Sequence, residues 1–323
     1  MLSQKKQTAE MSVIKPILKK FESFNKNFEI ISYIGSGCES KVYNISHKKS
    51  KKELTLKHIL NKRNNHCLNE LKIASELKHK NIINYMGNLS SKKDSSIFII
   101  MENGKIGNLN DFKKKISQRN RLSETMINFL AYQILKGLLY CHKCKIAHMD
   151  IKPKNIVIDE YLDVKIIDFS VSINYGDKKP NDKIKLPLCG TRFYMCSQVI
   201  NSNEIKIKNL NKVDAYSLGV LLYKLAFGFY RFNLRHEDED DYKVINQKIN
   251  SEFEIKNVIN FSTFFIDFIT KLLQKDINQR MSIFEAMEHP WIKGTQLLLD
   301  EKENNNNLNS FALKLIFLLK LNL

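Results

Sequence analysis

The segment that decides how this chain is understood reads His148-Met149-Asp150-Ile151-Lys152-Pro153-Lys154-Asn155. It places a carboxylate, an ammonium and a carboxamide within six residues, directly before an apolar run typical of a strand. Asp168 follows 13 residues after Asn155, at the end of the next strand-like run. Two strands that bring Asp168 and Asn155 together would supply the oxygen ligands that magnesium prefers. Asp150 could then accept the proton of an incoming hydroxyl, and Lys152 could neutralise charge on a phosphoryl group in transfer.

Upstream, a glycine-containing turn separates two strand-like runs. Gly35-Ser36-Gly37 lies between residues 28–34 and residues 41–45. Glycines let a backbone approach a phosphate closely, and the β-branched Val42 could cover a flat base. On its own the pattern is weak, because many hairpins carry two glycines separated by one residue.

A lysine and a glutamate follow at positions that could pair. Lys57 lies on a third predicted strand, residues 53–59, and Glu70 comes 13 residues later on a predicted helix. Glu70 could hold the Lys57 ammonium toward phosphate oxygens. Taken alone, each of these charges is more simply explained as a solvated side chain.

Composition places the chain among folded proteins. Of 323 residues, 43% are hydrophobic and 27% charged, which excludes collagen-like and wholly disordered chains. The net charge of +18 favours anionic partners, although Lys and Asn recur together throughout, so part of the charge reflects biased composition. There is no run of 18 apolar residues and no apolar stretch at the N-terminus. We therefore expect an intracellular protein, cytoplasmic or nuclear, without a transmembrane segment.

The six cysteines show no disulfide framework. Cys141-x-x-Cys144 is the spacing of a zinc ligand pair, but no second Cys or His pair follows at ligand distance. We therefore interpret this pair as part of a helix end.

Changes of pattern divide the chain into four regions. Residues 1–26 are polar and Lys-rich and predict a mobile arm or a loosely docked helix. Residues 27–103 are β-rich, and residues 104–295 are dominated by helical periodicity. Residues 296–323 combine an Asn-rich linker with a short apolar segment, which we expect to dock on the folded core rather than bind a partner or a membrane surface.

Taken together and in this order, residues 28–292 resemble the eukaryotic protein kinase family. The resemblance implies an α+β, bilobal protein-kinase-like fold, with a small β-rich N-lobe carrying one main helix and a larger, mainly helical C-lobe. Residues 101–104 are similar to the hinge that grips adenine, with Met101 as gatekeeper, and residues 190–195 to the segment that cradles the substrate residue. Further matches to the family are residues 214–219, Arg280 and residues 289–292.

The resemblance implies an enzyme that uses ATP and Mg²⁺ and acts on a protein substrate. In such an enzyme Lys57, held by Glu70, orients the α- and β-phosphates, and Asn155 and Asp168 bind Mg²⁺. Asp150 is the catalytic base, and Lys152 supports the γ-phosphoryl charge. The implied nucleotide contacts are Ile34, Gly35, Ser36, Gly37, Val42, Thr55, Lys57, Met101, Glu102, Gly104 and Val157.

Two features bear on the kind of kinase and its partners. Lys152 and Pro153 are typical of the serine/threonine type. Residues 81–87 and 166–172 are most similar to the sterile-type branch of the MAP-kinase cascade, whereas the triplet 148–150 is also similar to Wee-like cell-cycle kinases. Signalling partners that bind the terminal segments are the alternative to docking on the core, and we expect no specific nucleic-acid binding.

Some residues depart from the family pattern near the nucleotide. Ser40 and Ser170 stand where the family has glycine, and Thr55 where it has a small alanine. None of these changes removes a phosphoryl-transfer group. They leave a pseudokinase, a binding module that acts by protein contact, as the alternative function, and a kinase-shaped small-molecule phosphotransferase as a remoter one.

Other departures concern regulation and the substrate platform. Met149 replaces the arginine that binds an activation-loop phosphate, and residues 173–190 contain no Ser or Thr. We therefore predict activity without Ser/Thr phosphorylation in this loop. Gln198 replaces the glutamate that pairs with Arg280, which predicts a less rigid substrate platform. The acidic run 236–241 is interpreted as a solvated loop rather than a substrate contact.

Overall fold

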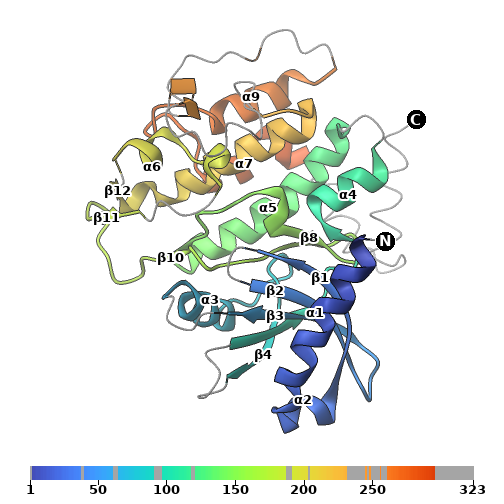
Figure 1. The fold of residues 1–323 in the computed structure, drawn as a ribbon. Helices are drawn as coiled ribbons and strands as arrows, with labels where there is room; N and C mark the ends of the chain where they lie inside the picture. Colours follow the sequence, from blue (N-terminus) through green and yellow to red (C-terminus); the bar gives the residue numbers. More distant parts are fainter. Residues whose placement is uncertain are drawn as a thin grey trace, which may run out of the picture. The chain divides into compact units, whose positions relative to one another are not determined.

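The computed structural model describes residues 2–37, 40–60, 65–90, 97–117, 121–186, 191–202, 204–230, 244–245, 247–248, 255 and 260–294 (Figure 1). The chain divides into two compact units. The N-terminal unit comprises Met1–Lys78 and Ile83–Asn103, and the C-terminal unit comprises His79–Ile82 and Gly104–Leu323. The division falls inside the segment 101–104, between Asn103 and Gly104.

The N-terminal unit is built on a five-stranded antiparallel sheet with the order β1-β2-β3-β5-β4. Its strands are β1 (Phe28–Ser36), β2 (Ser40–His47), β3 (Glu53–Ile59), β4 (Tyr85–Ser90) and β5 (Ile97–Glu102), and helix α3 (Asn65–Glu76) follows β3. Burial alternates along β3, where Leu54 and Leu56 are buried and Thr55 and Lys57 are half-buried. Because successive side chains in a strand point to opposite faces, Lys57 lies on the face opposite the Leu54–Leu56 side.

Two helices cover the Leu54–Leu56 face of this sheet. They are α1 (Leu2–Lys19), drawn dark blue across the sheet in Figure 1, and α2 (Glu22–Asn27). Ile14 and Leu18 of α1 are 0% and 1% exposed and pack in one core cluster with Leu56 and Phe98.

Two alternatives were predicted for residues 1–26, a mobile arm and a loosely docked helix; the structure has helices there, and they pack closely on the sheet. Lysines and other polar residues separate the apolar residues of α1, so the composition of the segment is polar overall. One narrow stripe of apolar side chains nevertheless packs on the sheet. Pro16 lies inside the helix, where proline usually signals a helix end, and this further obscured the pattern.

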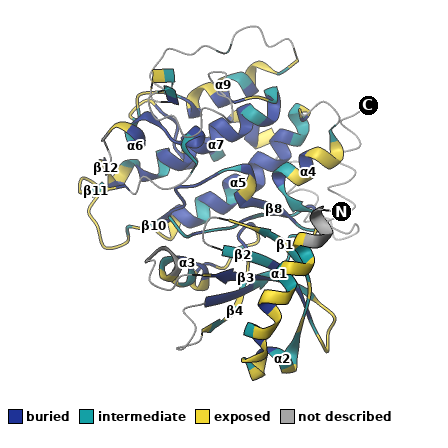
Figure 2. Ribbon diagram, viewed as in Figure 1, coloured by how far each residue is buried: buried dark blue, intermediate teal, exposed yellow. Residues whose placement is uncertain are grey.

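The C-terminal unit is mainly helical. Its helices are α4 (Leu109–Ile116), α5 (Glu124–Lys143), α6 (Ser197–Ser202), α7 (Leu210–Phe227), α9 (Thr263–Leu272) and α10 (Ile283–Met287). Figure 2 shows α5 and α7 largely buried, as expected for helices that are apolar on most sides. Gly137 permits the close approach of α5 to the 79–82 segment, because a Cβ there would lie 2.8 Å from the Asn81 carbonyl oxygen.

Short strands of the C-terminal unit position its polar side chains. The described strands are β6 (Gly107–Asn108), β7 (Ile146–Ala147), β8 (Ile156–Ile158), β9 (Val164–Ile166), β10 (Ile173–Asn174), β11 (Lys183–Lys185) and β12 (Glu204–Lys206), with 3₁₀ turns η1 (Pro153–Asn155), η2 (Arg192–Tyr194) and η3 (Ile207–Asn209). They pair as β6-β8-β9, β7-β10 and β11-β12. The expected small β-rich unit and larger helical unit are thus confirmed.

Several predictions fall outside the described residues. These are Cys38 and Glu39 of the glycine-containing turn, Gly190, the acidic run 236–241, and the linker and apolar segment within 296–323. In the part of the chain that is described, no helix has both the length and the apolar character needed to cross a membrane.

Candidate active site

Lys57 and Glu70 form an ion pair inside the N-terminal unit. The Lys57 Nζ lies 2.7 Å from Oε1 and 2.8 Å from Oε2 of Glu70, so the ammonium donates to both carboxylate oxygens. The two side chains are only 13% and 6% exposed. A largely buried charge whose partner is lost is costly, about 3–5 kcal/mol, so this geometry fixes the position of the Lys57 ammonium.

The glycine-containing turn offers backbone that no described side chain covers. Gly35 pairs with Val42 in the β1–β2 register, and Gly37 N–H donates to the Ser40 carbonyl oxygen at 2.9 Å. A Cβ at Gly35 would meet no described atom within 4 Å, and a Cβ at Gly37 only the Ser40 Oγ at 3.5 Å. Neither glycine has a positive φ, so the glycines serve neither packing nor a left-handed turn. Close approach of an external group is the remaining use of a glycine here.

The other predicted base contacts of the N-terminal unit lie on β1, β3 and β5. Ile34 is 55% exposed, and Thr55 of β3 pairs with Met101 of β5. The Thr55 hydroxyl donates to Asn103 Oδ1 at 3.4 Å. Backbone N–H of Asn84 donates to the Glu102 carboxylate at 2.7 Å.

Two further contacts made by asparagine side chains link β2, β3 and the residue after β5, and the sequence did not predict them. Asn103 Nδ2 donates to Asn44 Oδ1 at 3.1 Å, and Asn44 Nδ2 donates to Glu53 Oε2 at 2.9 Å. The β2–β3 and β3–β5 registers together bring these residues close, and no local pattern in the sequence marks them.

In the C-terminal unit, Gly104 and Val157 are in contact. A Cβ on Gly104 would lie 2.7 Å from Val157 Cβ, closer than any side chain allows. Glycine is therefore required at position 104 for the chain to pass this strand.

Asp150 is held on both of its carboxylate oxygens. Lys152 Nζ donates to Oδ2 at 2.6 Å, and Asn155 Nδ2 donates to the same oxygen at 2.9 Å. Backbone N–H of Thr191 donates to Oδ1 at 3.2 Å, which ties the start of η2 to the carboxylate. Asp150 is only 8% exposed, and three donors fix the orientation of its carboxylate.

A second, fully buried carboxylate binds the backbone just before Asp150. Asp214 accepts the backbone N–H groups of His148 and Met149, each at 2.8 Å, and lies 2.7 Å from His142 Nε2. Met149 has φ of 71°, a conformation that is costly for a bulky side chain and needs such anchoring. Burial alone would raise the pKa of Asp214, but the hydrogen bond and charge of His142, followed by the charge and backbone N–H of His148, outweigh it and lower the pKa.

The hairpin β8–β9 brings Asn155 and Asp168 to one end. Ile156 pairs with Ile166, and Ile167 N–H donates to the Asn155 carbonyl oxygen at 2.9 Å. Asn155 uses its amide nitrogen for Asp150, so its side-chain oxygen is the atom that could bind a metal. Asp168 is half-buried with φ of 67°, a left-handed conformation that Asp tolerates better than most residues.

This donor set fits magnesium. One amide oxygen and one carboxylate are the few protein ligands that Mg²⁺ takes when substrate phosphates and water complete its shell. Among the described residues, no three His, Cys, Asp or Glu side chains gather into a metal site. Of the cysteine pair, Cys141 is buried and Cys144 is exposed.

Comparison with known proteins agrees with this geometry. Residues 28–292 match the model of the protein kinase domain. The chain belongs to the protein kinase family. It is 30% identical over 271 residues to an Aurora kinase of Schizosaccharomyces pombe, covering 82% of this chain and 71% of that protein.

Other relatives of this kinase are longer than the chain. It is 30% identical over 310 residues to "Probable serine/threonine-protein kinase fhkA" of Dictyostelium discoideum, covering 83% of the chain and 50% of that protein. It is 29% identical over 256 residues to skeletal/cardiac myosin light chain kinase 2 of Mus musculus, covering 78% and 39%. The chain thus spans half the length of the Dictyostelium relative and 39% of the length of the myosin light chain kinase. The sequence identities to the three relatives are nearly equal, so they favour no single branch of the family.

The kinase holds Arg280 with neutral partners. Arg280 is 1% exposed and donates to Gln198 Oε1 at 2.9 Å and to the backbone carbonyl oxygens of Gln274, Lys212 and Lys275. Its guanidinium also lies 4.8 Å from the centre of the Tyr216 ring. Gln198 therefore provides the acceptor oxygen expected of it, and the three carbonyl groups, which the sequence analysis missed, supply the rest.

Proposed function

We propose that this kinase is an ATP-dependent protein serine/threonine kinase that transfers the γ-phosphoryl group of ATP to protein hydroxyls inside the cell. The observation that carries the proposal is the Asp150 carboxylate, held by Lys152, Asn155 and the Thr191 N–H. A carboxylate fixed beside an ammonium can orient a hydroxyl, accept its proton and leave positive charge close to the phosphoryl group.

The remaining predicted residues are assigned as follows. Lys57, fixed by Glu70, binds the α- and β-phosphates, and the uncovered backbone of Gly35 and Gly37 lies over them. Asn155 and Asp168 hold the divalent ion, which we propose to be Mg²⁺. When bound, Mg²⁺ neutralises charge that develops on the phosphate oxygens. The proposed base contacts are Ile34, Ser36, Val42, Thr55, Met101, Glu102, Gly104 and Val157.

We also propose that the kinase needs no phosphate on residues 173–190, a segment that contains no Ser or Thr. The one conventional acceptor there, Tyr175, is half-buried, and its hydroxyl donates to the His142 carbonyl oxygen at 3.3 Å. Burial, followed by the charge of Asp214, raises the pKa of Tyr175 to about 12. A hydroxyl used in this way is a poor acceptor for a regulatory phosphate.

The test uses radiolabelled ATP, Mg²⁺ and a mixture of protein substrates with the whole chain. Asp150→Asn should lose at least about a hundredfold in rate, because a positioned base contributes roughly 10²–10⁴-fold. Asp276→Asn is the matched control, since Asp276 is exposed and an asparagine keeps the oxygen that accepts the Asn278 N–H.

Three outcomes discriminate between the candidate functions. Loss in Asp150→Asn alone supports the kinase. Equal labelling by wild type and Asp150→Asn contradicts it. Stabilisation by ATP without any transfer favours the pseudokinase alternative. Mass spectrometry of active protein that finds an essential phosphate at Tyr175 would contradict the proposal on loop phosphorylation.

A further inference from the structure

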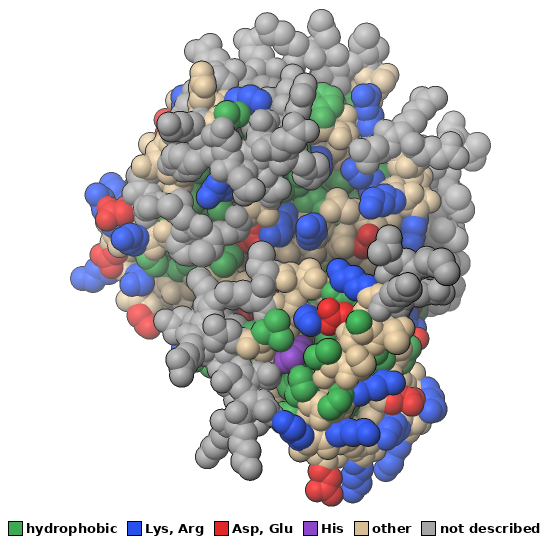
Figure 3. Space-filling model, viewed as in Figure 1, with side chains coloured by type: hydrophobic (Ala, Val, Ile, Leu, Met, Phe, Trp, Pro, Cys, Tyr) green, Lys and Arg blue, Asp and Glu red, His purple; other side chains and the backbone are tan. Residues whose placement is uncertain are grey.

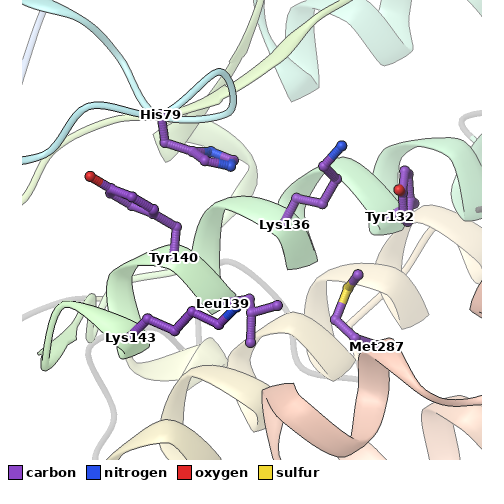
Figure 4. A pocket seen from close by; sticks show the side chains of 7 residues that line it. All are labelled: His79, Tyr132, Lys136, Leu139, Tyr140, Lys143 and Met287. Carbon is purple, nitrogen blue, oxygen red and sulfur yellow. The ribbon is translucent and has the colours of Figure 1, made fainter. Parts of the chain in front are cut away.

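The C-terminal unit carries a surface pocket that the proposed function does not use. The pocket has a volume of about 320 Å³ and is open on one side. Figure 4 shows its lining: five side chains from α5, together with His79 and with Met287 at the end of α10. The α5 residues are Tyr132, Lys136, Leu139, Tyr140 and Lys143, whose spacing places them on one helix face.

The floor of the pocket is apolar and aromatic. Leu139 and Met287 are half-buried, and the ring of Tyr140 stacks on His79 with centroids 4.9 Å apart and planes 25° apart. Tyr132 is buried, at 4% exposure. The pocket can therefore accept an aliphatic side chain without exposing new polar groups.

Two lysines on α5 give the pocket its charge. Lys136 and Lys143 have no carboxylate partner among the described residues, and no acidic side chain lines the pocket. Lys136 Nζ lies 5.2 Å from the centre of the Tyr132 ring, which places the ammonium beside the aromatic floor. Lys143 is exposed.

His79 adds a neutral donor. Its Nδ1 accepts the backbone N–H of Asn81 at 3.0 Å, so in the neutral ring the hydrogen lies on Nε2. Burial, followed by the charge of Lys136 and of two further lysines, lowers the pKa of His79 and keeps the ring neutral at pH 7. The polar groups that line the pocket can therefore donate to an anion but do not offer it a competing negative charge.

We propose that this pocket binds an acidic segment of a partner protein, in which two carboxylates flank an apolar side chain. Lys136 and Lys143 are two helical turns apart, about 10 Å along α5. In an extended peptide, residues i, i+2 and i+4 point to one side and span about 13 Å, a distance that flexible lysine stems can match. The central apolar residue would then pack on Leu139 and Met287.

A peptide fits the pocket better than a nucleic acid does. Base stacking needs an open aromatic face, but Tyr132 is buried and Tyr140 is stacked on His79. On the described part of the face drawn in Figure 3, Lys and Arg side chains are scattered and acidic side chains lie among them.

The test measures binding of fluorescent peptides to the whole chain by anisotropy, without ATP. The probe peptide is Gly-Glu-Gln-Leu-Gln-Glu-Gly, and its controls replace both Glu by Gln, both Glu by Lys, or Leu by Ser. The probe should bind about tenfold more tightly than the Gln peptide, since each exposed ion pair contributes modestly, and salt should weaken it. Because no phosphoryl transfer is measured, the result is independent of the proposed function.

Two variants locate the binding. Lys136→Glu/Lys143→Glu should weaken the probe about tenfold, whereas Lys206→Glu/Lys208→Glu, with the same charge change at two exposed lysines elsewhere, should not. Met287→Gln should weaken the Leu peptide but not the Ser peptide. Circular dichroism melts check that each variant is folded.

Four results would overturn the proposal. They are no saturable binding of the probe, equal binding by wild type and Lys136→Glu/Lys143→Glu, tighter binding of the Lys peptide, and displacement of the probe by a short oligonucleotide at equal concentration. The last result would point to a nucleic acid as the ligand.

Discussion

Each of the two units contains a buried carboxylate with a nitrogen partner, and the two pairs differ in what they leave accessible. Lys57 and Glu70 in the N-terminal unit keep 13% and 6% of their side chains exposed, and the Lys57 ammonium remains within reach of a ligand. Asp214 and His142 in the C-terminal unit are 0% exposed, and both Asp214 oxygens are used by the protein itself. The first pair positions a charge for use, and the second holds backbone in place.

The largest effect should come from Asp214→Asn. The amide would present an N–H₂ group toward backbone N–H donors and remove the buried carboxylate that holds the His148 and Met149 backbone, which we expect to cost about 3–5 kcal/mol. Thermal unfolding should fall by about 10 °C, and phosphoryl transfer should fall with it because the Asp150 loop loses its anchor. An unchanged melting temperature would show that Asp214 is not the support inferred here; Asp276→Asn controls for the exchange itself.

The Lys57–Glu70 pair should separate stability from activity. Lys57→Met leaves Glu70 buried without its partner and should destabilise the protein by about 3 kcal/mol, whereas Lys57→Met/Glu70→Leu removes both charges and should regain most of this. Both variants should lack phosphoryl transfer. Urea unfolding and the radiolabel assay check this together, and equal stability of the single and double variants would argue against a coupled pair.

A third buried group, His58, has no hydrogen-bond partner among the described residues. Both ring nitrogens lack hydrogen bonds, and the ring stacks on Phe98 at 4.4 Å. Burial, followed by the charge of Lys41, lowers the pKa of His58 from 6.5 to about 4. As the pH falls, His58 therefore takes up a proton in the unfolded state before it does so in the folded state. The free energy of unfolding decreases as the pH falls from 6.5 toward 4.

At pH 5 this loss should reach about 2 kcal/mol, and His58→Phe should remove it while changing little at pH 8. Urea unfolding at both pH values measures the difference. A variant as acid-sensitive as wild type would show that other groups carry the pH dependence.

The smallest effect is a gain. Gln198→Glu should place a charged acceptor against Arg280, and a charge-assisted hydrogen bond is stronger than the neutral one it replaces. We expect about 1 kcal/mol of added stability and about 2–4 °C in the melting temperature. Calorimetry of Gln198→Glu and wild type measures the difference in melting temperature. An unchanged melting temperature would mean that the three carbonyl acceptors already satisfy the hydrogen-bonding groups of Arg280.

The contacts among Asp150, Lys152 and Asn155 were easier to predict than those of the surrounding residues. Asp150, Lys152 and Asn155 lie within six residues, so a short pattern places them together whatever the rest of the chain does. A helix at the N-terminus was one of two predicted alternatives, but its close packing on the sheet was not predicted, because its buried stripe is narrow and its composition polar. The carbonyl acceptors of Arg280 were missed because every residue supplies a carbonyl group, and composition therefore gives no sign of which are used.

The sequence by itself determined the family, because the family depends on motifs with short spacings along the chain; it also supplied the residues that we propose for the chemistry. Only the tertiary structure decided that Asp214 anchors the loop at residues 148 and 149, that α1 covers a sheet, and that Lys136 and Lys143 flank a pocket with Met287. The physical reason is that each of these depends on contacts between residues far apart in the chain, which no local periodicity encodes.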